Sequence, residues 1–477
     1  MTTLDLPVRG HRDCASEGRT RYSLPVPADA RLALARGWLW LGMASLVGSG
    51  LFSILLVVSR TPGVNRLLPA ADFFHVALVA HVDLSVLVWF VSLAGMLWSL
   101  VAAPRAFGWA RAALGLAAAG TAAMALAPFT GAGEPIMANY IPMLTAPLFV
   151  GGLLLFGAGA ALLVGRTLLQ ARGTGARLDA AGALGFGLNA AAVATAVALL
   201  AFAWSWAVVP TELEGKAYYE ILFWGGGHAL QFTWTLLMLV AWLWLAGACG
   251  ARLPLSPRVT VLMFWLALAA VFATPVAYLA YDVASVEHRA ILTWAMRVGG
   301  GPAILPVALA AVVGLLSAPP LPREARPWRA ALLSSVLLFG AGGLIGVFIA
   351  GSNVRIPAHY HGCIVGVTLA LMGVVYRVLP SLGYAAPQGR LATAQPWVYG
   401  IGQLMHIVGL VWSGGYGVQR KVAGAEQVLR STGEIAGMGL MGLGGAVAIV
   451  GGLLFVVVVL RAMRGAGAPS AALEAVN

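Results

Sequence analysis

The chain has 477 residues, of which 60% are hydrophobic and only 10% are charged, with a mean hydropathy of +0.88. A soluble domain has roughly a quarter of its residues charged, so this composition excludes an ordinary soluble protein. The formal charge of +12 could suit a nucleic acid, but the basic residues lie in alternate loops between apolar segments, which excludes nucleic-acid binding as well.

The first 36 residues are polar and rich in arginine, and they predict a cytoplasmic N-terminal tail without a cleavable signal peptide. Residues 37–464 then contain about twelve apolar segments, each as long as the roughly 20 residues that cross a bilayer core. They are 37–58, 73–102, 107–128, 141–166, 181–209, 217–248, 258–281, 290–316, 328–351, 357–381, 394–414 and 435–461. Residues 465–477 form a C-terminal tail. The sequence therefore predicts an all-α polytopic membrane protein with one twelve-helix domain.

The charged residues predict the orientation of these helices. Arginines cluster in the N-terminal tail and in every second loop, and most acidic residues lie in the loops between. Cytoplasmic loops of membrane proteins carry an excess of Lys and Arg. The sequence therefore predicts that both termini lie in the cytoplasm of a bacterial inner membrane. Beyond the N-terminal tail, the arginines that mark the predicted cytoplasmic side are Arg105, Arg111, Arg166, Arg172, Arg177, Arg252, Arg258, Arg323, Arg326, Arg329, Arg377, Arg390, Arg461 and Arg464.

Histidines are the most informative residues inside the apolar segments. An ionisable residue in a membrane helix is costly and points to function, and neutral imidazole is the usual axial ligand of haem iron. Four histidines occupy three segments that run inward from an outer loop. At 1.5 Å per residue they lie at similar depths, roughly 3–17 Å below the outer surface. These four are His81, His228, His359 and His361, whereas His75 and His406 carry no predicted role.

The sequence HYH at 359–361 predicts two haem sites on one helix. Residues two positions apart on a helix differ by about 200° in direction, so the rings of His359 and His361 face opposite sides. His81 is the natural second ligand for one of the two haems, and His228 would face the other across a cavity. The chain has no CxxCH motif for covalent attachment, so the haems are expected to be non-covalent and b-type.

Arg420 and Lys421 lie in a predicted outer loop and break the charge pattern. Haem propionates are anionic and need cationic partners, so these two side chains are plausible propionate ligands. A solvated loop with two charges is the alternative.

Together these residues resemble subunit I of the haem-copper oxidase superfamily, especially the nitric oxide reductases and the cbb-type cytochrome oxidases. The resemblance implies that His81 and His361 bind a low-spin haem, that His359 binds a high-spin haem, and that His228 binds a second metal. It also implies reduction of a small gas, nitric oxide or dioxygen, with His228 and His359 as catalytic residues. Electrons would come from a separate outer-side subunit, a cytochrome c or a cupredoxin-type subunit II.

The chain departs from this family at the second metal. Val276 and Ala277 stand where the family has a pair of histidines, and Phe232 stands where it has tyrosine or glutamate. Only Glu287 and His288, just beyond that segment, could complete a ligand set with His228. Divalent metals usually need three or more protein ligands, so we expect no stoichiometric copper and at most weakly held non-haem iron.

Three functions remain open on the sequence alone. The first is the gas-reducing respiratory enzyme, with protons taken up from the outer side past Glu212, Glu214 and Glu220. The second is a two-haem electron-transfer or gas-sensing protein that has lost the second metal. The third is a cation transporter that binds its cation at the membrane histidines.

Overall fold

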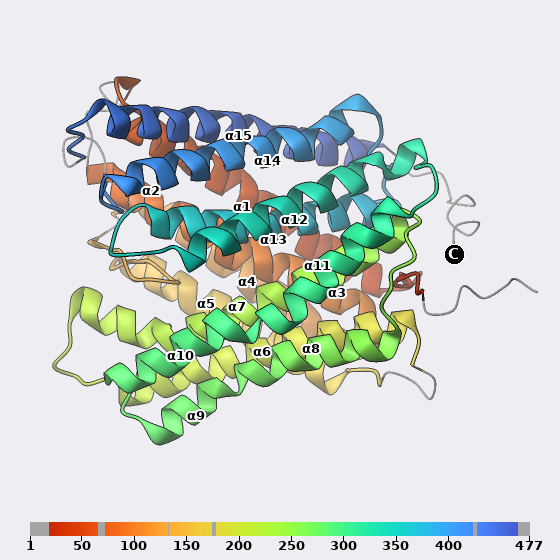
Figure 1. The fold of residues 1–477 in the computed structure, drawn as a ribbon. Coiled ribbons are helices and arrows are strands. Elements are labelled where there is room, and N and C mark those ends of the chain that lie inside the picture. Colours follow the sequence, from red (N-terminus) through yellow and green to blue (C-terminus); the bar gives the residue numbers. More distant parts are fainter. Residues whose placement is uncertain (1–18, 65–71, 132, 174–177, 423–426, 466–477) are drawn as a thin grey trace, which may run out of the picture.

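The computed structural model describes residues 19–64, 72–131, 133–173, 178–422 and 427–465, which form one bundle of long helices (Figure 1). The first half contains α1 (Arg31–Arg60), α2 (Asp72–Val82), the π-helix η2 (Asp83–Val88), α3 (Trp89–Val101), α4 (Phe107–Leu126), η3 (Ala127–Phe129), β1 (Pro135–Ile136), β2 (Met143–Leu144), α5 (Pro147–Leu169), α6 (Ala180–Val208) and α7 (Gly215–Ala248). The second half contains α8 (Pro257–Val271), α9 (Ala273–Ala280), α10 (Val286–Gly299), α11 (Gly301–Leu316), η4 (Arg323–Ala325), α12 (Arg326–Val347), α13 (Arg355–Val378), α14 (Gly389–Gly415) and α15 (Thr432–Arg464).

The predicted membrane fold is confirmed. Within the described residues, 11 helical segments are long and apolar enough to cross a membrane. The remaining predicted segment, 394–414, forms the 27-residue helix α14, which is less apolar because it contains Gln395, Gln403 and His406. The segment predicted at 141–166 starts late, at Pro147, because β1 and β2 pair as a short antiparallel hairpin before it.

Three of the membrane segments make up the interior of the bundle. In α7, in Phe73–Val101 and in α13, 89%, 83% and 78% of the most apolar window is buried, against 33–50% in the other segments. These are the segments that carry His81, His228 and the pair at 359–361. The candidate ligands therefore lie on the helices that are most enclosed by protein, not on the lipid-facing ones.

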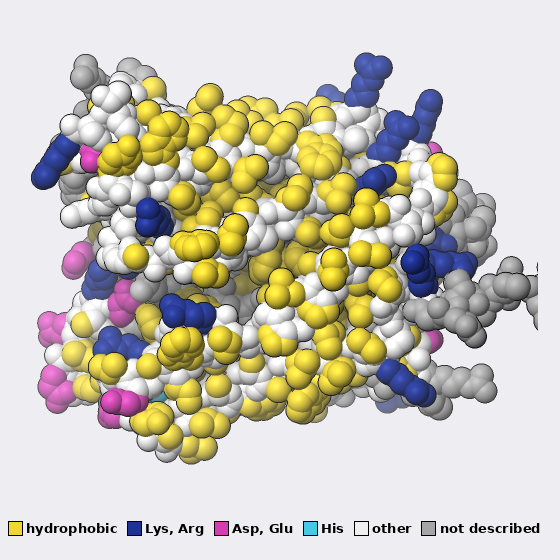
Figure 2. Space-filling view, viewed as in Figure 1, with side chains coloured by type: hydrophobic (Ala, Val, Ile, Leu, Met, Phe, Trp, Pro, Cys, Tyr) yellow, Lys and Arg dark blue, Asp and Glu magenta, His cyan; other side chains and the backbone are white. Residues whose placement is uncertain are grey.

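The surface has the charge pattern of a membrane protein. Figure 2 shows a broad band of apolar side chains with charged side chains gathered at its two ends. Acidic side chains gather mainly at the left end of the bundle, where α7 and α10 begin. Helix α1 begins at the other end.

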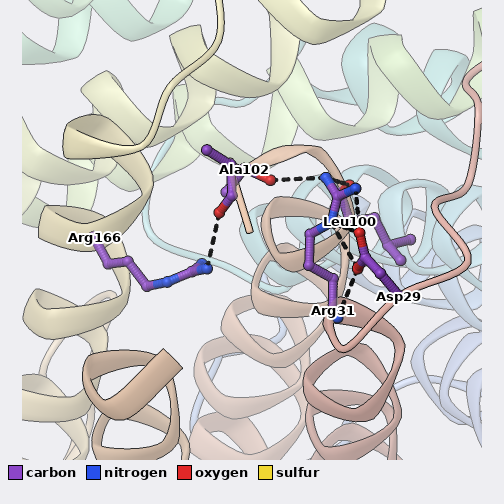
Figure 3. Close-up of polar contacts among 6 residues, drawn as sticks. Asp29, Arg31, Leu100, Ala102 and Arg166 are labelled. Atoms are coloured by element: carbon purple, nitrogen blue, oxygen red, sulfur yellow. Dashed lines mark hydrogen bonds and ion pairs between the residues drawn. The ribbon is translucent and has the colours of Figure 1, made fainter. Parts of the chain in front are cut away.

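At the end of the bundle where α1 begins, two arginines bind backbone carbonyls of the segment that follows α3 (Figure 3). Arg31 forms an ion pair with Asp29 at 2.8 Å and donates to the carbonyl of Ala102 at 2.9 Å. Arg166, at the end of α5, donates to the carbonyl of Ala103 at 3.4 Å. These contacts tie α1, α3 and α5 together where helix-end carbonyls would otherwise lack partners.

Helices α14 and α15 pack backbone against backbone along glycines. A Cβ on Gly402 would meet the backbone of Ala448, and a Cβ on Gly444 would meet the backbone nitrogen of His406. Small residues allow such close approach between membrane helices. The packing fixes the position of His406 against α15.

We therefore expect Gly444→Val to lower the free energy of unfolding by about 3 kcal/mol, since forced overpacking costs this order and backbone atoms cannot rotate away. Thermal unfolding of the purified protein in detergent measures the loss. Gly439→Val, on the same helix where a Cβ meets nothing within 4 Å, is the matched control and should have little effect. Equal melting temperatures for the two variants would contradict the close packing.

Candidate haem-binding site

His81 is the last residue but one of α2, just before the π-helix, and its ring is oriented by α1. Its Nδ1 lies 2.9 Å from the hydroxyl and 3.1 Å from the carbonyl oxygen of Ser49. A carbonyl can only accept, so Nδ1 carries the hydrogen and Nε2 keeps its lone pair. Metal-binding histidines typically show this arrangement, in which the second nitrogen donates to a carbonyl. His81 is therefore prepared to ligate an iron through Nε2.

His359 and His361 lie in the first two turns of α13 and face different neighbours. The His359 Nδ1 donates to the carbonyl of Gly342 on α12 at 2.7 Å. The His361 ring instead lies 5.0 Å from the ring of His406 on α14. The two rings thus have neighbours on different helices, α12 for His359 and α14 for His361.

Buried cations lie close to these histidines. The Nη2 of Arg60 and the Nε of Arg355 are buried and have no hydrogen-bond partner. Arg60 and Arg420 both lie within electrostatic range of Tyr360, the residue between the two histidines. The Nε of Arg60 donates to the side-chain oxygen of Gln427 at 3.3 Å, but among the described residues no carboxylate forms an ion pair with Arg60 or Arg355. A buried charge without a counter-ion is strongly unfavourable, so this region calls for an anion. Free imidazole nitrogens beside guanidinium groups that lack a carboxylate partner fit a haem, whose propionates supply the negative charge.

Lys421 has a different environment from Arg420. Its Nζ donates to the carbonyl of Met137 at 2.6 Å and lies 3.4 Å from the Asn139 side-chain oxygen. Burial, and then the neighbouring Arg420, lower the pKa of Lys421 to about 8. Lys421 thus holds the segment between β1 and β2 against the loop before α15, and its backbone carbonyl accepts from His75 at 3.2 Å.

His228, on α7, is 2% exposed and has partners for both ring nitrogens. Its Nδ1 donates to the carbonyl of Trp224 at 2.8 Å, and its Nε2 lies 2.9 Å from the hydroxyl of Tyr140. Burial and the nearby Glu220 raise the pKa of Tyr140, so the phenol stays protonated and donates to Nε2. The lone pair that a metal would need is therefore engaged by Tyr140.

Of the other residues considered for a second metal, only His288 lies within electrostatic range of His228. Val276 is 52% exposed, and Ala277 is buried but has no ligating atom. Glu287 is exposed at the start of α10. His288 is buried, with its ring 4.6 Å from Tyr278 and no partner for either nitrogen. Among the described residues no three His, Cys, Asp or Glu side chains are grouped to hold a metal. These side chains do not fit a second metal ion.

A cleft of about 590 Å³ lies at the end of the bundle where α7 begins. It is lined by Asn139, Lys216, Glu220, Trp224 and Arg289, among others. Asn139 donates to Glu220 at 2.8 Å, and the Trp224 ring lies 4.7 Å from the His228 ring. The cleft therefore reaches a direct neighbour of His228.

Sequence reasoning missed Tyr140 and Arg60. Tyr140 lies just before a segment that was predicted as a helix, and the only signal was the polar Asn139 between two prolines. Arg60 ends the first apolar segment on the predicted outer side, so it breaks the predicted charge pattern as Arg420 does.

The fold defines a polytopic membrane protein with its candidate histidine ligands on the most buried helices. The sequence model of the family described as "Cytochrome C and Quinol oxidase polypeptide I" matches residues 33–454, so the chain belongs to this haem-copper oxidase subunit I family. Membership implies a respiratory oxidoreductase with haem cofactors, integral to a membrane.

Two similar proteins and one solved structure cover most of the chain, and a third protein covers a short part of it. An uncharacterized protein of Rickettsia prowazekii is 30% identical over 90% of this chain and 96% of its own length. An uncharacterized protein of Aquifex aeolicus is 28% identical over 76% of this chain and 88% of its own. Cytochrome c oxidase subunit 1 of Thermus thermophilus is 32% identical over 84 residues, 16% of this chain. A heme-copper terminal oxidase dimer solved by cryo-EM shares the fold, with a TM-score of 0.71 at 15% identity over 93% of this chain and 85% of that one.

Proposed function

We propose that this chain is the catalytic subunit of a respiratory oxidoreductase that reduces nitric oxide or dioxygen. In this proposal His81 and His361 hold a low-spin haem and His359 holds a high-spin haem. The observation that supports it most is the separation of His359 and His361 onto opposite sides of α13, because it lets one helix serve two haems. When bound, the haems would supply one-electron transfer and an iron able to bind the gas.

Other groups of the protein would orient the histidine ligands and neutralise the charge of the haem propionates. Ser49 and Gly342 accept from the Nδ1 atoms of His81 and His359, which directs each Nε2 lone pair away from these helices. Arg60 and Arg420 are placed to bind carboxylates near Tyr360. They would compensate the charge of propionate groups, because among the described residues neither guanidinium forms an ion pair with a carboxylate.

Proton supply can use the outer cleft. Reduction of either gas consumes protons, and Tyr140 holds one on its hydroxyl, hydrogen-bonded to His228. Its chain neighbour Asn139 binds Glu220, which lines the cleft. We infer that protons reach the catalytic side from the outer face through these groups, with His228 as the acceptor that positions the Tyr140 hydroxyl.

The electron donor is proposed to be a separate subunit on the same outer face, a cytochrome c or a cupredoxin-type subunit II. The charge distribution supports insertion in a bacterial inner membrane with both termini in the cytoplasm, because arginines concentrate at the end where α1 begins.

Purified protein tests this proposal. A reduced-minus-oxidised spectrum with pyridine haemochrome analysis is expected to show two non-covalent haems per chain, and metal analysis should show no stoichiometric copper. Supplied with a chemical reductant, the protein should consume nitric oxide or dioxygen. Haem-free protein would refute the proposal.

A second function has support from a specific contact. Because Tyr140 engages the His228 lone pair, the chain could carry electrons or sense a gas without turnover. Two haems together with no consumption of either gas would establish this alternative. A haem-free protein that accumulates a cation in vesicles would instead establish the transporter.

A further inference from the structure

A third histidine joins the pair predicted to bind the low-spin haem. His406, on α14, lies with its ring 5.0 Å from that of His361, at an interplanar angle of 49°. His81 is within electrostatic range of both. Three histidines from three different helices, α2, α13 and α14, therefore share one region of the interior, although a haem uses at most two of them at a time.

Hydrogen bonding distinguishes these three rings. The His406 Nδ1 lies 3.0 Å from the carbonyl of Met441 on α15, just as the His81 Nδ1 lies 3.1 Å from the carbonyl of Ser49. A carbonyl accepts only, so both rings carry the hydrogen on Nδ1 and present a free Nε2 lone pair. The His361 ring forms no hydrogen bond with any residue that the structure describes. By the criterion that a ligand's second nitrogen is held by a carbonyl, His406 is better oriented than His361.

His406 also lies where α14 and α15 pack closely. An added Cβ on Gly444 of α15 would clash with the backbone nitrogen of His406, and one on Gly409, a turn further along α14, would clash with the backbone of Met441. The helix that carries His406 and the carbonyl that orients its ring are therefore held in direct contact.

We propose that His406 is a second ligand position for the low-spin haem and can replace His361 as the partner of His81. The inference rests on the proposed function, since it requires that the haem is bound. Either neutral imidazole would hold the iron through its Nε2, so the replacement of one by the other would gain or lose no proton or electron. It would change the reduction potential of the haem, because axial ligation is one of the features that set that potential.

The test is to follow the haem by electron paramagnetic resonance and visible spectra in His361→Leu, His406→Leu and the double variant, each purified as the full chain. The proposal predicts that His361→Leu retains a six-coordinate low-spin haem with altered g values and midpoint potential. His406→Leu should keep its signal through His361, and only the double variant should lose it. His75→Leu, which removes a histidine outside this group, is the control for loss of an imidazole as such.

The outcomes separate the inference from the function on which it rests. If wild-type protein binds no haem, the proposed function fails. If wild-type protein binds both haems but His361→Leu loses the low-spin signal as completely as the double variant, only the inference is overturned. His361→Ala serves as a second variant at this position. If His406→Leu can be purified as folded protein but neither His361 variant can, the inference is overturned too. In that case His406 would be unable to replace His361 as the haem ligand.

Discussion

His81→Ala is expected to abolish the low-spin haem signal and to leave the high-spin haem in place. His81 is the only one of the candidate ligands that comes from α2, and its ring is held by two contacts to Ser49. Mutating a residue that merely orients a metal ligand costs about 10–100-fold in metal affinity, so losing the ligand itself should cost more than about 100-fold. A reduced-minus-oxidised spectrum and electron paramagnetic resonance measure the loss, and electron delivery to the gas should stop with it.

Ser49→Ala is the matched control for this variant. It removes the hydroxyl at 2.9 Å from Nδ1 but keeps the Ser49 carbonyl at 3.1 Å, so the ring should stay oriented and the haem should stay bound. A six-coordinate low-spin signal that survives in His81→Ala would show that another residue, and not His81, supplies the ligand.

The helical bundle could be predicted from hydropathy. A run of about 20 apolar residues is long enough to cross the bilayer core as a helix, and this determines which segments span the membrane. The order of His81, His228 and the 359–361 pair on the three most buried segments could be predicted for the same reason. The hairpin before α5 could not, since Ile141, Met143 and Leu144 are apolar enough to extend a helix and only the pairing of β1 with β2 excludes it.

Contacts between residues that are far apart in the chain could not be predicted from the sequence. The hydroxyl of Tyr140 meets His228, 88 residues later, and the Nδ1 of His406 meets a carbonyl 35 residues later. A histidine pattern gives the depth of a ring but not its hydrogen-bond partners. Those partners decide which ring nitrogen is free, and they separate His81, His359 and His406 from His228.

His359→Ala is expected to reduce gas consumption to background while the low-spin haem remains. The His359 ring faces α12, where its Nδ1 donates to the carbonyl of Gly342 at 2.7 Å, away from His361. Its removal should therefore leave the other side of α13 unchanged. Carbon monoxide binds ferrous haem with an open position, so the carbon monoxide difference spectrum of the reduced protein should disappear in this variant while the low-spin bands persist.

Cys363→Ala is the control for His359→Ala, because Cys363 lies one helical turn later on the same side, with its sulfur 3.9 Å from the His359 Nδ1. Loss of this thiol removes neither the imidazole nor its bond to Gly342, so both the carbon monoxide spectrum and gas consumption should survive. If His359→Ala instead retained carbon monoxide binding and turnover, the high-spin haem would have a different ligand. If both variants lost the signal, packing between α12 and α13, and not the imidazole, would be its cause.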